Sequence, residues 1–191
     1  MKLEETVVQK KKVYEGKVLS VYEDLVRCPN GHLATREVIR RCEASAVLAI
    51  CEDGRWILEK QYRYPYDEIL WEIPAGKMDA GETPLHTAIR ELEEETGYHS
   101  DEMHYLGKMY PTCGYSDEVI HLFVAQNLKK AVQHLDENEA LELYYFTPEE
   151  VYNMLKEGKI VDGKTICAIQ FYQLWKKTEG EVDDKTVCKI L

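Results

Sequence analysis

The sequence has no apolar stretch long enough to cross a membrane, and the residues after Met1 lack the apolar core of a signal peptide. It also lacks a basic excess, because 24 lysines and arginines stand against 35 aspartates and glutamates, a net charge of −11. Proteins that bind nucleic acids or anionic membranes usually present a basic patch. We therefore expect a cytoplasmic protein that binds neither nucleic acid nor membrane.

Closely spaced cysteines are also missing. None of the six forms a Cys-x-x-Cys pair with another, which argues against a zinc site. Most lie in apolar or strand-like stretches, and a disulfide framework would suit a shorter secreted chain. We predict that all six are reduced and that most are buried: Cys28, Cys42, Cys51, Cys113, Cys167 and Cys188.

Repeats and low-complexity linkers are absent, and 191 residues suit one domain with a small appendage. Residues 13–41 alternate apolar and polar side chains around Pro29-Asn30-Gly31, a pattern typical of a β-hairpin. We predict an N-terminal β segment over residues 1–43 and an α+β domain over residues 44–191. The acidic tail after Thr178 is expected to be loosely held.

The second domain shows clear signals for strands and helices. The runs at 44–51 and 55–63 are typical of strands, as are three runs after the first helix. Thr147-Pro148-Glu149-Glu150 predicts a capped helix to about Lys156, and a last helix is predicted from about Lys164 to Lys177. The residues spaced for one face of that last helix are Ile166, Ile169, Gln170, Gln173 and Leu174.

The first helix of this domain is rich in glutamate. Thr83 suits its N-cap, Pro84 its first position and Gly97 the left-handed residue that ends it. At ~100° per residue, its glutamates 91, 94 and 95 share one face beside an apolar stripe. Like charges at this spacing repel, and one arginine at position 90 offsets only part of the charge. A divalent cation would offset the rest, although many acidic helix faces are simply solvated.

A pattern that extends beyond the helix distinguishes between a metal-binding face and a solvated face. From Gly76 the chain reads GKMDAGETPLHTAIRELEEETGY, which is Gly-x5-Glu-x7-Arg-Glu-U-x-Glu-Glu-x-Gly-U, with U a bulky aliphatic residue. This resembles the signature of Nudix hydrolases. Its seven fixed positions would match by chance on the order of 10⁻⁸ times per starting residue. Tyr98 departs from the aliphatic residue of the last position, where we expect an effect on packing rather than on chemistry.

The resemblance implies a Nudix fold, an α/β/α sandwich with a mixed β-sheet, and a loop–helix–loop that binds Mg²⁺ or Mn²⁺. It implies that Glu91 and Glu95 bind metal, with Glu82 and the backbone carbonyl of Ala75 completing the metal region. It also implies that Arg90 orients these glutamates by salt bridges. A metal-bound water then attacks a diphosphate.

Stretches outside the signature resemble the ADP-ribose pyrophosphatase branch of that family: LEKQYRYPYDEILWEIPAGK, the marker proline Pro111, and LDENEALELYYFTPEE. By this resemblance Glu139 is a further metal ligand, and Glu94 or Glu137 activates the water. The open alternative for residues 137 and 139 is a solvated turn. Cys113 stands where the branch commonly has a proline, so this loop is expected to be more flexible.

The same resemblance assigns substrate contacts. Arg36 and Arg63 would reach the phosphates, because a guanidinium matches phosphate oxygens, and Glu72 would support Arg36 or contact the terminal ribose. The alternatives are a surface ion pair for each arginine and a buried hydrogen bond for the glutamate. The N-terminal segment is expected to complete the adenine site of a partner in a homodimer, with Tyr14, Leu19 and Tyr22 as candidates.

The predicted reaction is hydrolysis of ADP-ribose to AMP and ribose 5-phosphate. Within enzymes, the alternative is another nucleoside diphosphate sugar or a dinucleotide. Outside enzymes, the alternative is a nucleotide-sensing module without turnover, against which the complete set of glutamates argues.

Overall fold

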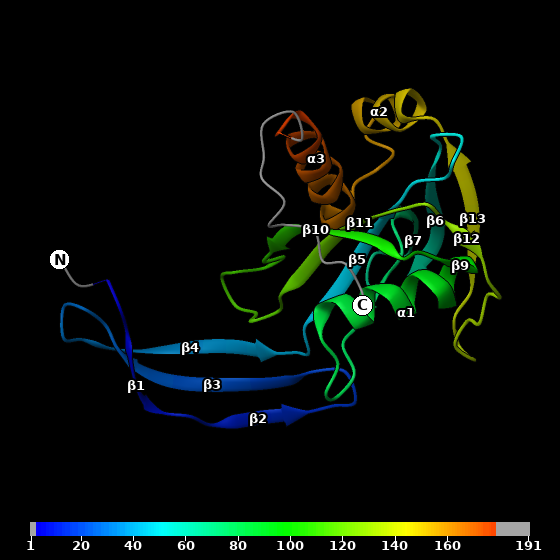
Figure 1. Cartoon of the computed structure of the whole chain (residues 1–191). Coiled ribbons are helices and arrows are strands. Elements are labelled where there is room, and N and C mark those ends of the chain that lie inside the picture. The colour runs from blue at the N-terminus through cyan, green and yellow to red at the C-terminus, as the bar shows by residue number, and fades with distance from the viewer. Residues whose placement is uncertain (1–2, 179–191) are drawn as a thin grey trace. The chain divides into compact units, whose positions relative to one another are not determined.

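The computed structural model describes residues 3–178 (Figure 1). The predictions for the tail after Thr178, including Cys188, lie outside the described residues. The chain divides into two compact units. Unit one comprises the described residues up to Cys42 together with residues 110–119, and unit two comprises residues 43–109 together with the described residues from Ile120 on.

Unit one contains an antiparallel sheet. Strand β3 pairs with β4 along one edge, and with β1 and then β2 along the other. The turn between β3 and β4 is closed by the Cys28 N–H, which donates to the His32 carbonyl, and Gly31 adopts a φ of 89°. The hairpin predicted around Pro29–Gly31 is therefore present. The four strands are β1 (Thr6–Gln9), β2 (Lys12–Glu15), β3 (Ser20–Arg27) and β4 (Leu33–Arg40).

Unit two contains two larger sheets. The first is mixed, in the order β10-β11-β5-β8, and only its β11–β5 pair is parallel. The second is antiparallel, in the order β13-β6-β7, and a short β12–β9 pair completes the unit. The strands are β5 (Ala44–Ala49), β6 (Trp56–Arg63), β7 (Glu68–Glu72), β8 (Ala75–Lys77), β9 (Tyr98–His99), β10 (Glu102–Met109), β11 (Ile120–Gln126), β12 (Lys129–Lys130) and β13 (Leu141–Phe146).

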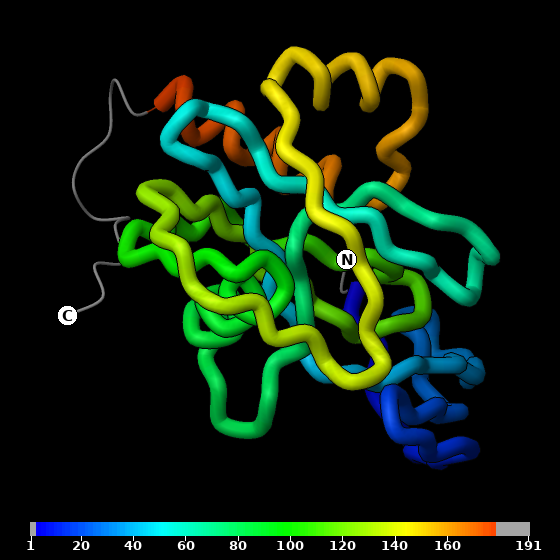
Figure 2. Tube along the Cα trace, turned by 90° about the vertical axis from the view of Figure 1, so that its right-hand side faces the viewer, coloured from blue at the N-terminus to red at the C-terminus, as the bar shows by residue number. Residues whose placement is uncertain are grey.

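The described residues contain three helices, α1 (Pro84–Thr96), α2 (Pro148–Lys156) and α3 (Gly163–Thr178). Strand β5 is buried on both faces, so its alternate side chains enter two different cores. Val47 and Ala49 pack in one core with Leu92 of α1, whereas Leu48 packs in the other with Ile169 of α3. The mixed sheet therefore lies between α1 and α3, as expected for an α/β/α sandwich. Figure 2 shows α2 and α3 (orange and red) together on one side of the strands.

The predicted ends of the helices are confirmed. The Thr83 side chain accepts a hydrogen bond from the His86 N–H, and Gly97 ends α1 with a φ of 67°. Thr147 and Glu150 form the predicted capping box at the start of α2. These ends depend on contacts within a few residues, which is why the sequence alone predicts them.

Two predictions about burial are wrong. On α3, Ala168, Ile169 and Tyr172 are buried, whereas Gln170 and Leu174 of the predicted face are exposed. Apolar residues occur all around this helix, so its periodicity does not select one face. The five described cysteines are free, but none is fully buried, and two of them lie at the surface. None of the helices described is both long and apolar enough to span a membrane.

Candidate active site

Arg90 holds the start of the glutamate cluster together. Its guanidinium donates to Glu82 (Nε to Oε1, 2.9 Å), Glu91 (Nη1 to Oε1, 2.7 Å) and Glu94 (Nη1 to Oε2, 2.8 Å). It also donates to the backbone carbonyl of Lys77, 2.9 Å away. This one side chain therefore contacts three carboxylates and fastens the loop before α1 to the helix.

Glu82 is the best stabilised of these acids. Its carboxylate accepts hydrogen bonds from Arg90, from the Asp79 backbone N–H and from the Thr87 hydroxyl. These bonds, with Arg90 first, lower the pKa of Glu82 to about 2. Glu82 therefore fixes the loop to the helix as an ionised carboxylate.

Glu91 lies directly against the first glycine of the signature. A Cβ added to Gly76 would fall 1.9 Å from the Oε1 atom of Glu91, so only glycine leaves room for the carboxylate. Burial raises the pKa of Glu91 to about 7, although Arg90 opposes the shift. The spacing of the signature thus corresponds to a physical contact between a strand and a helix.

Glu95 is more deeply buried than its position beside the apolar stripe suggested. Glu95 is 2% exposed, and its Oε2 accepts a hydrogen bond from the backbone N–H of Ala75 at 2.7 Å. Burial, and then the charges of Glu59, Glu91 and Glu139, raise the pKa of Glu95 well above its ordinary value. Glu95 is therefore a buried carboxylate beside other negative charges.

The two acids of the later loop have different surroundings. Glu139 accepts a hydrogen bond from the Gln61 side chain at 3.1 Å, and its charge helps to raise the pKa of both Glu91 and Glu95. Glu137 is exposed in the turn of the same loop. Both line an open hollow of about 440 Å³ with Gln61. Glu139 therefore lies close enough to the glutamates of α1 for its charge to affect them, whereas Glu137 lies at the surface.

The donor set suits a hard divalent cation. The buried carboxylates raise one another's pKa, so their negative charge is not fully neutralised, and Mg²⁺ and Mn²⁺ prefer oxygen ligands. The Glu91 carboxylate occupies the space that a side chain at position 76 would fill. Within residues 3–178, however, no three His, Cys, Asp or Glu side chains are already arranged to bind one ion. Local donors hold the carboxylates instead, so an ion would have to draw them together.

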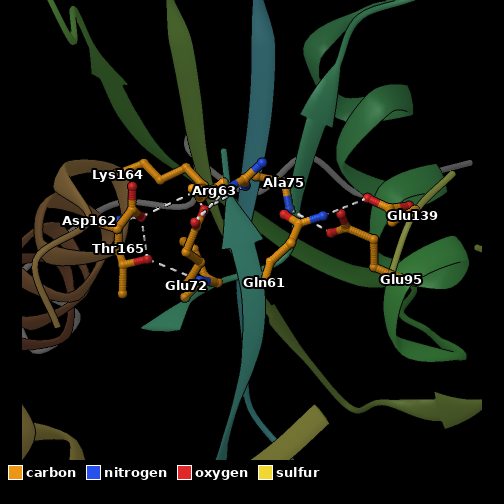
Figure 3. Close-up of polar contacts among 10 residues, drawn as sticks. Gln61, Arg63, Glu72, Ala75, Glu95, Glu139, Asp162, Lys164 and Thr165 are labelled. Carbon is orange, nitrogen blue, oxygen red and sulfur yellow. Dashed lines mark hydrogen bonds and ion pairs between the residues drawn. The ribbon is translucent and has the colours of Figure 1, made fainter. Parts of the chain in front are cut away.

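A second polar network connects β6 and β7 to the start of α3 (Figure 3). Arg63 donates two hydrogen bonds to Glu72, at 2.6 and 2.7 Å, and Lys164 pairs with the same carboxylate. Burial opposes ionisation of Glu72, but these two cations outweigh it and hold its pKa below its ordinary value. Lys164 also reaches Asp162 at 3.1 Å. Glu72 therefore has the buried hydrogen-bonding role that was its alternative. Support for Arg36 or contact with the terminal ribose stays a prediction.

Arg36 belongs to unit one, where it forms the surface ion pair that was its alternative. Its guanidinium, which is partly exposed, donates to the Glu5 carboxylate and approaches the Cys28 sulfur at 3.7 Å. A contact with substrate phosphates remains a prediction for Arg36 and for Arg63.

Sequence reasoning missed two residues of these networks, Glu59 and Lys164. Both are buried, at 1% and 9% exposure. Glu59 occupies a strand position among apolar residues, and Lys164 begins a helix, so neither belongs to a recognisable pattern. For Glu59, the only local signal was an acidic residue directly after the apolar run of residues 56–58.

Replacing Lys164 with methionine is expected to lower the free energy of unfolding by about 2–4 kcal/mol, because it leaves the buried Glu72 with fewer partners. Urea denaturation measures this difference. The matched control is Lys159→Met, which removes an exposed pair with Glu157 and should change stability by less than about 1 kcal/mol. Equal effects of the two substitutions would contradict a structural role for the Lys164 pair.

Known proteins share this arrangement of elements. Residues 40–169 match the family described as the NUDIX domain. The chain is 39% identical over 181 residues to an ADP-ribose pyrophosphatase of Bacillus subtilis, covering 94% of this chain and 98% of that protein. It is 40% identical over 173 residues to a methanol dehydrogenase activator of Bacillus methanolicus, covering 90% and 94%.

Two further similarities are more distant. An ADP-ribose pyrophosphatase of Mycobacterium tuberculosis is 33% identical over 161 residues, covering 82% of this chain and 77% of that protein. The crystal structure of an ADP compounds hydrolase superposes with a TM-score of 0.84, covering 95% of this chain and all of the other, at 23% identity. The last similarity establishes the fold.

Proposed function

This chain belongs to the Nudix hydrolase family, and we propose that it splits the diphosphate of ADP-ribose into AMP and ribose 5-phosphate with the help of Mg²⁺ or Mn²⁺. The observation that carries the proposal is the carboxylate cluster on α1, in which Glu91 lies over Gly76 and Arg90 joins three glutamates. The similarity to two ADP-ribose pyrophosphatases supports the choice of substrate.

In the proposed reaction, Glu91, Glu95 and Glu139 would hold the metal ions, and Glu82 and the carbonyl of Ala75 would complete the metal region. A bound divalent cation neutralises phosphate charge and lowers the pKa of a water. Arg90 keeps the carboxylates oriented through its hydrogen bonds.

Water activation and phosphate binding fall to other side chains. Glu94 or Glu137 accepts the proton of the attacking water at a carboxylate oxygen; both are at least partly open to solvent. Arg63 and Arg36 bind phosphate oxygens, and Glu72 keeps the Arg63 guanidinium in place through two hydrogen bonds.

A substrate panel tests this proposal. ADP-ribose, GDP-mannose, ADP-glucose and NADH are incubated with the protein and Mg²⁺, an added phosphatase releases phosphate from the products, and parallel reactions contain EDTA. We expect the fastest release from ADP-ribose and none with EDTA. Faster hydrolysis of another compound would identify that compound, instead of ADP-ribose, as the preferred substrate. If no compound were hydrolysed, the result would favour a nucleotide-sensing module.

We also propose a cytoplasmic homodimer, in which the N-terminal segment over residues 1–43 completes the partner's substrate site. Its support within unit one is apolar surface on β1 and β2, where Val7, Val13 and Tyr14 are all at least half exposed. Free thiols in the described residues agree with a reducing compartment. Light scattering at micromolar concentration would contradict the dimer if it gave the mass of one chain.

A second candidate function is the activation of an alcohol dehydrogenase. It is favoured by the 40% identity to a methanol dehydrogenase activator over 90% of this chain. Adding the protein to a methanol dehydrogenase and following the rate of methanol oxidation tests it. An unchanged rate would contradict this second candidate.

A further inference from the structure

Glu59 is a buried acid that the signature does not include. It lies on β6, directly opposite Glu72 on β7, and its side chain is 1% exposed. Side chains alternate along a strand, so Glu59, Gln61 and Arg63 lie on one face of the sheet. Gln61 on this face binds Glu139, and Arg63 binds Glu72. Glu59 therefore lies on the face that contributes to both polar networks.

The Glu59 carboxylate is incompletely hydrogen-bonded. Its Oε2 atom is buried and has no hydrogen-bond partner among residues 3–178. Leaving a polar group unpaired in a protein interior costs about 1–3 kcal/mol, and more for a charged group. The nearby cations are already engaged, because Arg63 donates to Glu72 and Lys164 pairs with Glu72 and Asp162. Some further partner would therefore stabilise Glu59.

Glu59 is also a neighbour of the α1 glutamates. Ile57, which lies two residues before Glu59 on the same face of β6, packs in one core with Leu92 of α1. Figure 3 shows Glu95 and Glu139 bound to Ala75 and Gln61, the latter lying two residues after Glu59 on β6. The unpaired oxygen thus belongs to a carboxylate beside the cluster that suits a divalent cation.

We propose that Glu59 is an additional acid of the metal site, and that it binds the divalent cation held by Glu91 and Glu95, either directly or through a water that the cation retains. A divalent cation such as Mg²⁺ or Mn²⁺ would give the unpaired oxygen the direct partner that no described side chain provides through a hydrogen bond. The inference rests on the proposed function, because it requires the α1 glutamates to bind metal.

Binding of Mn²⁺ alone tests this role without measuring turnover. The full chain is freed of metal with EDTA and dialysed, and free Mn²⁺ is then measured by electron paramagnetic resonance during a titration. We expect Glu59→Gln to weaken the Mn²⁺ affinity about 10- to 100-fold. The matched control is Glu68→Gln, an exposed carboxylate on the neighbouring strand β7, which should bind Mn²⁺ as the unaltered chain does.

Thermal unfolding in EDTA shows whether each variant is folded. Glu59→Val is the second variant, because valine suits a buried strand position and cannot bind metal. If both folded variants bind Mn²⁺ within about threefold of the unaltered chain, Glu59 takes no part in metal binding and the inference is wrong. If Glu95→Gln alone loses Mn²⁺, the proposed function stands without Glu59. If the unaltered chain binds no Mn²⁺, both proposals fail.

Discussion

Glu95→Gln is expected to abolish nearly all hydrolysis of ADP-ribose while the chain stays folded. The amide oxygen can still accept the Ala75 N–H, so the local hydrogen bond survives. The negative charge is lost, and with it the stabilisation of a bound cation. We expect kcat to fall by about 100-fold or more, since losing several kcal/mol of charge stabilisation has that effect.

The control for this substitution is Glu93→Gln on the same helix. Glu93 faces His99, away from the cluster, and its side chain is 41% exposed. Its replacement makes the same chemical change and should leave kcat within about twofold, because no charge near the site is altered. If Glu95→Gln kept a tenth of the activity, the metal assignment of Glu95 would fail. Circular dichroism melting in EDTA establishes that both variants are folded.

Gly76→Ala is expected to have an effect of similar size for a steric reason. The new methyl group would lie 1.9 Å from Glu91 Oε1 and 2.0 Å from its Cδ, so the carboxylate must move away from β8. A displacement of about 1 Å in a catalytic group can cost about 100-fold in rate. Steady-state kinetics with ADP-ribose, together with Mn²⁺ titration, should show losses in both kcat and metal affinity.

Gly163→Ala is the control for adding a methyl group. At the start of α3, a Cβ would meet only the end of the Met109 side chain at 3.9 Å, which is an ordinary contact. Alanine also favours a helix over glycine. We therefore expect unchanged activity and equal or higher stability. Wild-type activity in Gly76→Ala would show that the Glu91 carboxylate need not occupy the space over Gly76.

Features that depend on neighbours in the sequence were predictable. Thr83 and Gly97 limit α1 through contacts within four residues, and the shared helix face of Glu91 and Glu95 follows from their spacing. The contact of Gly76 with Glu91 crosses from a strand to a helix, but the signature encodes it because both lie in one continuous segment.

Features that depend on distant segments were not predictable. Glu139 meets Gln61 across 78 positions of sequence, and Lys164 meets Glu72 across 92. No periodicity connects such pairs, so the sequence alone did not predict the Gln61–Glu139 and Lys164–Glu72 contacts. The prediction of which face of α3 is buried was wrong for the same reason, because the packing of Ile169 and Tyr172 depends on strands far away in the chain.

The alternation along β6 links chemistry to strand pairing. Glu59, Gln61 and Arg63 point to one side only because β6 is aligned residue by residue with β7 and β13. A slip of one residue would turn all three outward together and carry apolar neighbours such as Leu58 to the wrong side. Misaligned chains would thus be inactive as well as unstable. The specific activity of a refolded sample should therefore report how faithfully its strands have aligned.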